Sequence, residues 1–128
     1  MGDNKIRAVP AGLSALTSLT YLDVSGNRLE SLPHEIGSLT RLRELHVSRN
    51  KLVDLPADLR GLSANLVKLH AYGNKLTSLP AVVTSLAKLV ELDFSDNAIE
   101  AVPAGITKLS ALSDVILINN KLTYVFLV

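Results

Sequence analysis

Apolar residues recur along the chain in a frame that repeats every 23 residues, and once after 24. Within each copy, two apolar positions such as Leu22 and Val24 are separated by one residue, which places both side chains on one face of a short strand. The following apolar positions are three apart, as from Leu29 to Leu32, and a proline comes next at Pro33 and at equivalent positions. Because proline is excluded from a regular helix interior, each copy is predicted to contain a strand and a 3₁₀ or extended return path.

An asparagine follows each strand segment and marks the period of the repeat. A chain with this repeat can bury its leucines only by stacking each turn on its neighbours, so parallel strands should line one side. The asparagine amide, buried at the bend after the strand, can satisfy backbone groups that would cost about 1–3 kcal/mol each if left unpaired. The sequence therefore predicts a structural asparagine ladder, which begins near Asn4 and comprises Asn27, Asn50, Asn74, Asn97 and Asn120.

The repeat divides the whole chain, residues 1–128, into the turns of one domain. The expected divisions are a partial turn 1–15, full turns 16–38, 39–61, 62–85 and 86–108, and an incomplete turn 109–128. The third full turn has four steps instead of three between Leu62 and Leu66, so one residue among 63–65 should bulge from the loop that enters the strand. Ala71 is small and Phe94 large for the column that they share, so Phe94 is expected to fill the space that Ala71 leaves.

This frame resembles the leucine-rich repeat, L-x-x-L-x-L-x-x-N-x-L, which is matched by Leu19, Leu22, Val24, Asn27 and Leu29 and by their copies. The Leu-Pro-x-x-Ile ending at 32–36 is similar to the 23-residue intracellular subclass found in Ras-pathway and polarity scaffolds, plant Ras-group repeat proteins and Roco GTPases. The resemblance implies an α/β fold, a right-handed solenoid with a parallel sheet on its concave side and 3₁₀ or extended returns on its convex side. It also implies protein recognition as the usual activity.

Composition narrows the classes of function. The 13 basic and 12 acidic residues leave a net charge of +1, so no overall field attracts nucleic acid or an anionic membrane. The chain has no cysteine, which excludes disulfides and thiolate metal sites and favours an intracellular, cytoplasmic setting. No apolar run approaches the roughly 20 residues that span a bilayer, so no membrane insertion is expected.

Residues that alternate with the buried strand positions should point toward the concave surface, in columns formed by successive turns. The first column is Tyr21, Glu44, Lys68, Glu91 and Asp114; the second is Asp23, His46, His70, Asp93 and Ile116; the third is Ser25, Ser48, Tyr72, Ser95 and Ile118. Tyrosines and a local apolar patch at Ile116 and Ile118 suit a protein partner. These columns, without their serines, are the candidate partner-binding surface, although any solenoid also needs a polar inner face.

The sequence gives little support for a catalytic site or a metal site. His46 and His70 could share a Zn²⁺ ion with Glu44, but exposed histidines beside acids occur on any polar face, so no metal and no cofactor are expected. No serine lies on a strained elbow beside an oxyanion hole, so no catalytic residue is assigned. A basic strip of Lys5, Arg28, Lys51, Lys75 and Lys121 lines one edge and could contact phosphate, but without interleaved aromatic residues a solvated charged edge is the favoured interpretation.

Both ends lack the polar caps that close a solenoid. The chain is therefore interpreted either as a fragment of a longer array, which is the favoured interpretation, or as a chain whose apolar C-terminal edge pairs with another copy as a homodimer. Under both interpretations the isolated chain should tend to self-associate, and the candidate residues are Ile116, Ile118, Phe126, Leu127 and Val128. Three functions remain open. The first is a non-enzymatic scaffold or recruitment module that binds a protein on its concave face. The others are a repeat segment of a multidomain signalling enzyme, such as a Roco-type GTPase or kinase, and a self-associating structural unit.

Overall fold

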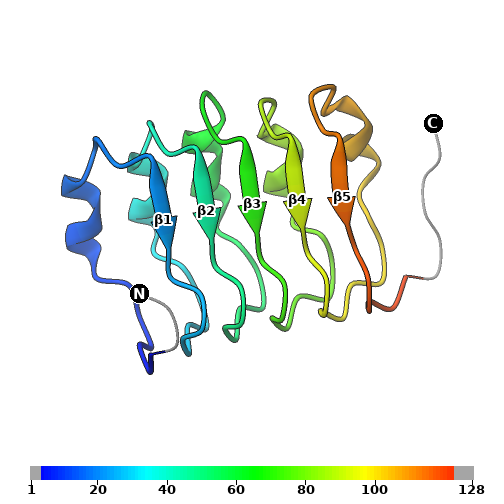
Figure 1. The fold of residues 1–128 in the computed structure, drawn as a ribbon, viewed down its shortest axis with the longest axis horizontal. Helices are drawn as coiled ribbons and strands as arrows, with labels where there is room; N and C mark the ends of the chain where they lie inside the picture. The colour runs from blue at the N-terminus through cyan, green and yellow to red at the C-terminus, as the bar shows by residue number, and fades with distance from the viewer. Residues whose placement is uncertain (1–3, 123–128) are drawn as a thin grey trace.

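The computed structural model describes residues 4–122 and arranges them as a solenoid of stacked turns (Figure 1). Strands and 3₁₀ helices alternate along the chain in the order η1 (Ala11–Ala15), β1 (Tyr21–Asp23), η2 (His34–Ser38), β2 (Glu44–His46), η3 (Ala57–Leu62), β3 (Lys68–His70), η4 (Ala81–Ser85), β4 (Glu91–Asp93), η5 (Ala104–Lys108) and β5 (Asp114–Ile116). The strands form one parallel sheet in chain order, β1-β2-β3-β4-β5. The parallel sheet and the 3₁₀ returns confirm the predicted fold class.

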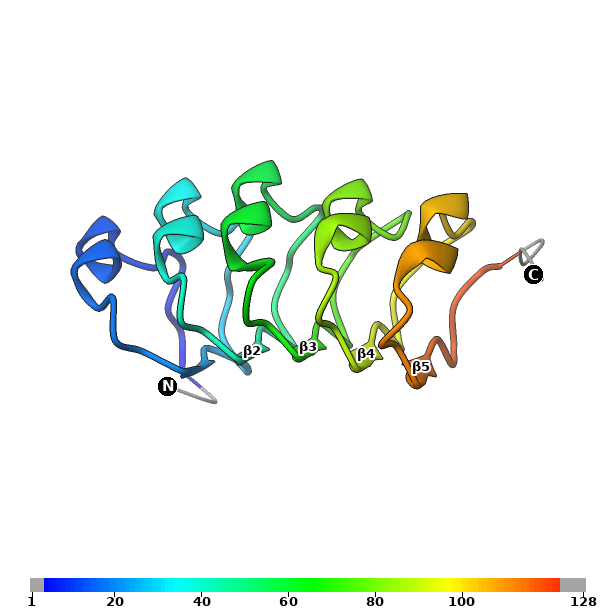
Figure 2. The same ribbon diagram turned by 90° about the horizontal axis from the view of Figure 1, so that it is seen from above.

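The strands lie along one side of the solenoid and the 3₁₀ helices along the other (Figure 2). The helices are spread more widely than the strands in this view, so the sheet occupies the concave side. A proline precedes every helix, at Pro10, Pro33, Pro56, Pro80 and Pro103. Since proline at the start of a helix sacrifices no intrahelical hydrogen bond, these residues begin the short helices of the return path.

The apolar columns of the repeat form one continuous core. Leu22, Leu45, Leu69 and Leu92 are paired in register across the strands and are buried. The next column contains Val24, Val47, Ala71 and Phe94, and all four are also buried. Phe94 is the largest of the fully buried side chains. Because each side chain is covered chiefly by the turns before and after it, the core is stabilised by neighbour contacts along the solenoid.

The recurring asparagines connect each turn to the one before it. Asn50 Oδ1 accepts a hydrogen bond from the Leu29 N–H at 3.0 Å, and its Nδ2 donates to the carbonyl oxygens of Val24, Val47 and Ser48 at 3.1, 3.1 and 3.2 Å. The same arrangement recurs at Asn74, Asn97 and Asn120. Each of these amides therefore satisfies backbone groups in two successive turns.

A serine ladder runs beside the asparagines and corrects the interpretation of the third column. Ser25, Ser48 and Ser95 are buried, not displayed on the concave surface. Ser25 Oγ accepts a hydrogen bond from the Ser48 N–H, and Ser48 Oγ accepts one from the Tyr72 N–H, both at 3.1 Å. The residue after each member of this column has a positive φ; these residues are Gly26, Arg49, Gly73, Asp96 and Asn119. The third column lies beyond the end of each strand, where the backbone turns. The alternation of side chains along a strand therefore does not determine whether these side chains point toward the concave surface or into the core.

The extra residue of the third turn is absorbed in the loop before β3, as the sequence predicts. The Leu66 N–H bonds the carbonyl of Leu62, four residues back, whereas the Leu42 N–H in the preceding turn bonds Leu39, three residues back. Asn65 Nδ2 donates to the carbonyl of Thr40 at 2.8 Å and holds the enlarged loop against its neighbour. The register between β2 and β3 is continuous through residues 44–46 and 68–70.

Candidate functional site

The sheet brings the first two predicted columns together as two rows across the concave face. The first row pairs Tyr21, Glu44, Lys68, Glu91 and Asp114 in strand order, and the second pairs Asp23, His46, His70, Asp93 and Ile116. Adjacent strands of a sheet lie about 4.8 Å apart, so neighbouring members of a row are within reach of one another. We refer to these two rows as the concave face.

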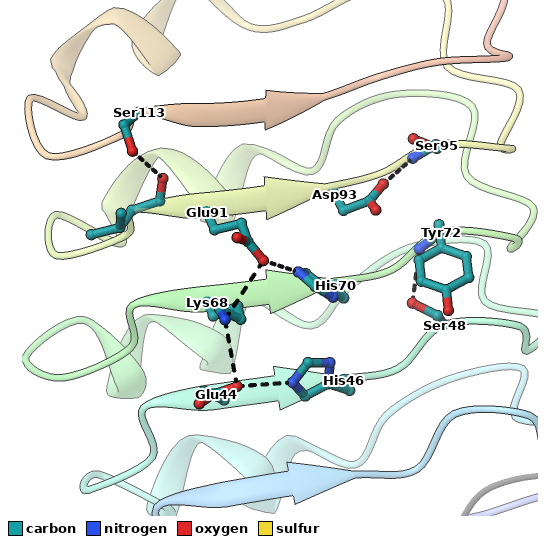
Figure 3. A network of polar contacts seen from close by, with 11 residues as sticks. Glu44, His46, Ser48, Lys68, His70, Tyr72, Glu91, Asp93, Ser95 and Ser113 are labelled. Carbon is teal, nitrogen blue, oxygen red and sulfur yellow. Dashed lines mark hydrogen bonds and ion pairs between the residues drawn. The ribbon is translucent and has the colours of Figure 1, made fainter.

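A polar network occupies the middle of the concave face, on β2, β3 and β4 (Figure 3). His46 Nε2 lies 3.2 Å from Glu44 Oε1 on its own strand, whereas His70 Nε2 lies 2.5 Å from Glu91 Oε2 on the next strand. Lys68 Nζ lies between the two carboxylates, 4.0 Å from Glu44 and 3.8 Å from Glu91. Ion pairs this close to solvent add little to stability, so their main effect is to orient the side chains.

Aromatic rings continue from this network to β1. The ring centroid of Tyr21 lies 5.2 Å from that of His46, and the His46 and His70 centroids lie 4.8 Å apart in an edge-to-face arrangement. The side of Tyr21 that does not pack is open to solvent, since the residue is 51% exposed. Rigid rings with one polar end are efficient contact residues, because little side-chain entropy is lost when they are buried by a partner.

Two carboxylates, those of Asp23 and Asp93, flank the histidines in the second row. Asp23 Oδ1 accepts a hydrogen bond from the Ser25 N–H at 2.9 Å, and Asp93 Oδ1 accepts one from the Ser95 N–H at 3.0 Å. Burial raises the pKa of Asp23, but the hydrogen bonds from Ser25 and the charge of His46 outweigh it, so the pKa lies below its ordinary value. Asp23 is therefore ionised at neutral pH.

A comparison with known families decides the class of protein. The model of a family described as Leucine Rich repeats, in two copies, matches residues 17–63. Residues 17–63 of this chain are leucine-rich repeats. The matched part contains β1, β2, η2 and η3, and the same asparagine hydrogen bonds continue beyond it to Asn120. No curated protein matches the chain.

The match to this family bears on the class of function. Leucine-rich repeats generally mediate protein–protein interactions and are typically non-enzymatic. Among residues 4–122, no helix has the length and apolar character that are needed to cross a bilayer.

The two histidines do not form a metal centre with their neighbours. Each Nε2 atom contacts a different carboxylate, that of Glu44 for His46 and that of Glu91 for His70. Within the described residues, no group of three or more histidine, cysteine, aspartate or glutamate side chains is placed to hold a metal ion.

The last described turn of the chain exposes apolar side chains. Ile118 is 65% exposed and Ile116 is half-buried. Val115 continues the buried column of Leu92 but is 46% exposed, because β5 is hydrogen-bonded to a strand on one side only among residues 4–122. The other candidates for self-association, Phe126, Leu127 and Val128, lie outside the described residues.

Proposed function

We propose that this protein is a non-enzymatic interaction module that binds a protein partner on its concave face. The observation that carries the proposal is the unbroken pair of rows on β1–β5, with the Tyr21 ring at one end, a polar network in the middle and the apolar Ile116 beside Asp114 at the other end. Aromatic and apolar anchors surrounded by polar groups are typical of protein interfaces. The proposed contact residues are the members of the two rows together with Tyr72 and Ile118, which come two residues after His70 and Ile116. The full set is Tyr21, Asp23, Glu44, His46, Lys68, His70, Tyr72, Glu91, Asp93, Asp114, Ile116 and Ile118.

The charges of the concave face support a partner segment that carries lysine or arginine. The two rows contain five carboxylates, at Asp23, Glu44, Glu91, Asp93 and Asp114, and one lysine. That lysine, Lys68, is shared between two of the carboxylates, so the face has an excess of negative charge. Complementary charges steer a partner and fix its orientation, and exposed rings such as Tyr21 can receive a cation on their faces.

Reversing two charges in the middle of the face tests this function. Random peptides displayed on phage would be selected on the wild-type protein, and we expect the selected peptides to be enriched in lysine and arginine. A combined Glu44→Lys and Glu91→Lys variant should bind them at least about tenfold more weakly, because juxtaposed like charges cost several kcal/mol. Dissociation constants from titration calorimetry would measure the effect.

A matched variant makes the test specific to the concave face. Glu35→Lys with Asp58→Lys changes the net charge equally but acts on η2 and η3, on the opposite side of the solenoid. We expect this control to bind the selected peptides as the wild type does. Equal affinity for wild type and the Glu44/Glu91 variant would refute the concave-face proposal, and selective loss in the Glu35/Asp58 control would place the interface on the convex side.

Self-association through the last described turn is a second candidate function. The exposure of Val115 and Ile118 supports it, since exposed apolar strand edges favour pairing with another chain. Multi-angle light scattering should show a molar mass that rises with concentration for the wild type, whereas Ile116→Lys with Ile118→Lys should stay monomeric. The control Ser110→Lys with Ala111→Lys, at exposed positions of the same turn, should behave as the wild type. A wild type that is monomeric at every concentration would exclude this candidate.

A further inference from the structure

A basic cavity lies near the bends that follow the strands, which form the lower edge of the solenoid in Figure 1. It has a volume of about 270 Å³ and is lined by Arg7, Arg28, Glu30 and Lys51. Arg28 and Lys51 belong to the basic strip that the sequence indicates, because each directly follows an asparagine. Arg7 was missed by that reasoning, since it lies three residues after its asparagine, in a different column.

The stacking of the turns fixes the backbone that carries these cations. The Arg28 N–H donates to the carbonyl of Ile6, beside Arg7, at 2.8 Å, and the Lys51 N–H donates to the carbonyl of Leu29 at 2.7 Å. The three basic residues therefore come from three successive turns whose relative positions are set by the hydrogen bonds of the ladder region. A ligand bound here would not have to order the backbone first, which preserves binding free energy.

Among the residues that the structure describes, the positive charges around the cavity outnumber the negative ones. Among residues 4–122, the side chains of Arg7, Arg28 and Lys51 make no hydrogen bond or ion pair, unlike Lys68 on the concave face. All three side chains are exposed, and Glu30 is the only carboxylate in the lining. Because three cationic side chains and one carboxylate line the cavity, its electrostatic potential is positive, and a bound anion would neutralise it.

We infer that this cavity binds a phosphate monoester carried on a side chain of a protein partner. A guanidinium presents its N–H donors in a planar fork that matches phosphate oxygens, and an ammonium adds a point charge. Two arginines and one lysine therefore suit the near-dianionic charge and the three acceptor oxygens of a phosphoryl group. The cavity is lined by charged side chains only, those of Arg7, Arg28, Glu30 and Lys51. The phosphoryl group would therefore be recognised through its charge and through hydrogen bonds.

Single-stranded nucleic acids and anionic membranes fit the cavity less well than a phosphate monoester does. Single-stranded nucleic acids are held largely by base stacking on aromatic side chains, and none of the lining residues is aromatic. Anionic membranes are bound by clusters of about four to eight basic residues, whereas this lining offers three and includes Glu30. The cavity also shares no residue with the concave face, so a partner could place a basic segment on the sheet and a phosphorylated residue at the edge.

The proposal is tested with a fluorescein-labelled phosphoserine peptide of glycine and serine, beside its unphosphorylated counterpart. Fluorescence anisotropy with the full chain should give at least about tenfold tighter binding of the phosphopeptide, because charge-assisted hydrogen bonds are roughly twice as strong as neutral ones. Arg7→Gln with Arg28→Gln should abolish this preference. Lys88→Gln with Lys108→Gln removes the same charge from exposed positions outside the cavity and outside the basic strip and should retain it.

Further measurements distinguish a phosphate on a protein from a phosphate on a lipid, and they distinguish the cavity from the concave face. Inorganic phosphate should compete with the phosphopeptide, and the Glu44/Glu91 variant should bind the phosphopeptide as the wild type does, whatever the outcome for the concave face. If the double arginine variant fails to fold, Lys51→Gln provides the same comparison. The inference is overturned by equal affinity for the two peptides, by an equal loss in the Lys88/Lys108 control, or by arginine-dependent binding of phosphatidic acid vesicles without binding of the phosphopeptide.

Discussion

Replacing Phe94 with alanine is expected to lower the free energy of unfolding by about 3–5 kcal/mol, the usual cost of removing a fully buried phenyl group. Phe94 is 0% exposed and its backbone lies one turn beyond Ala71, whose own side chain is too small to close the space left behind. Cavities in a packed core collapse only partly, so both transfer free energy and packing are lost. Urea unfolding followed by circular dichroism would measure the change.

Two companion variants make the packing argument specific. Val53→Ala, at a residue that is 64% exposed, should change the free energy of unfolding by less than about 0.5 kcal/mol. Ala71→Leu should recover part of the loss in the Phe94→Ala background, while in the wild type it should destabilise the core by about 1–3 kcal/mol through overpacking. A loss below about 1 kcal/mol for Phe94→Ala, against the expected cavity cost, would contradict the proposed packing of this column.

Replacing Asn50 with alanine should cost about 2–4 kcal/mol, because it leaves a buried backbone donor without a partner and removes several further hydrogen bonds. The donor is the Leu29 N–H, for which Asn50 Oδ1 is the acceptor. The carbonyl oxygens of Val24, Val47 and Ser48 lose less, since each also accepts a hydrogen bond from another group. The free energy of unfolding in urea would again be the measured quantity.

Asn120 provides an internal control for the ladder. It makes equivalent hydrogen bonds to Ile99, Phe94 and Leu117, but its side chain is half-buried in the last described turn. Water can replace part of what is lost there, so Asn120→Ala should cost less than Asn50→Ala. Equal costs at the two positions, or a negligible cost at Asn50, would show that the ladder is not a main source of stability.

The register of the sheet could be predicted from the sequence because turns of equal length must stack in phase. A period of 23 residues places Glu44 beside Tyr21, and the strand pairing has this register. The position of the extra residue in the 24-residue turn could also be predicted. The spacing from Leu62 to Leu66 locates this residue before the strand and not within it. Periodicity thus determines the backbone arrangement, while the partner-binding role of the concave face stays a prediction.

The orientation of the third column could not be predicted by strand alternation. That rule was applied one step beyond the end of each strand, where residues with positive φ such as Arg49 and Asp96 turn the backbone. Small hydroxyl residues then fit below the surface and accept hydrogen bonds from the next turn, as Ser25 does from the Ser48 N–H. The recurrence of serine between buried positions, at Ser25, Ser48 and Ser95, was the available signal.

The pairing of side chains within the concave face could not be predicted from the sequence either. The sequence places His46 and His70 in equivalent positions, yet His46 pairs with a glutamate on its own strand and His70 with one on the next strand. The choice depends on rotamers and on the position of Lys68 between both carboxylates, and a repeat pattern does not encode either. The basic cavity was incomplete in the sequence for a related reason, since Arg7 enters it from another column.

The enlarged loop at residues 63–65 shows where this architecture can accept new sequence. An added residue there changes the turn before β3 and is held by Asn65, while the pairing of Leu45 with Leu69 is unaffected. Chain length and strand register are therefore independent of each other at this position, and surface loops tolerate insertions at low entropic cost. A recognition peptide or a fluorescent reporter grafted between Ser63 and Asn65 should leave the rows of the concave face in place, so the loop offers a route to bispecific variants.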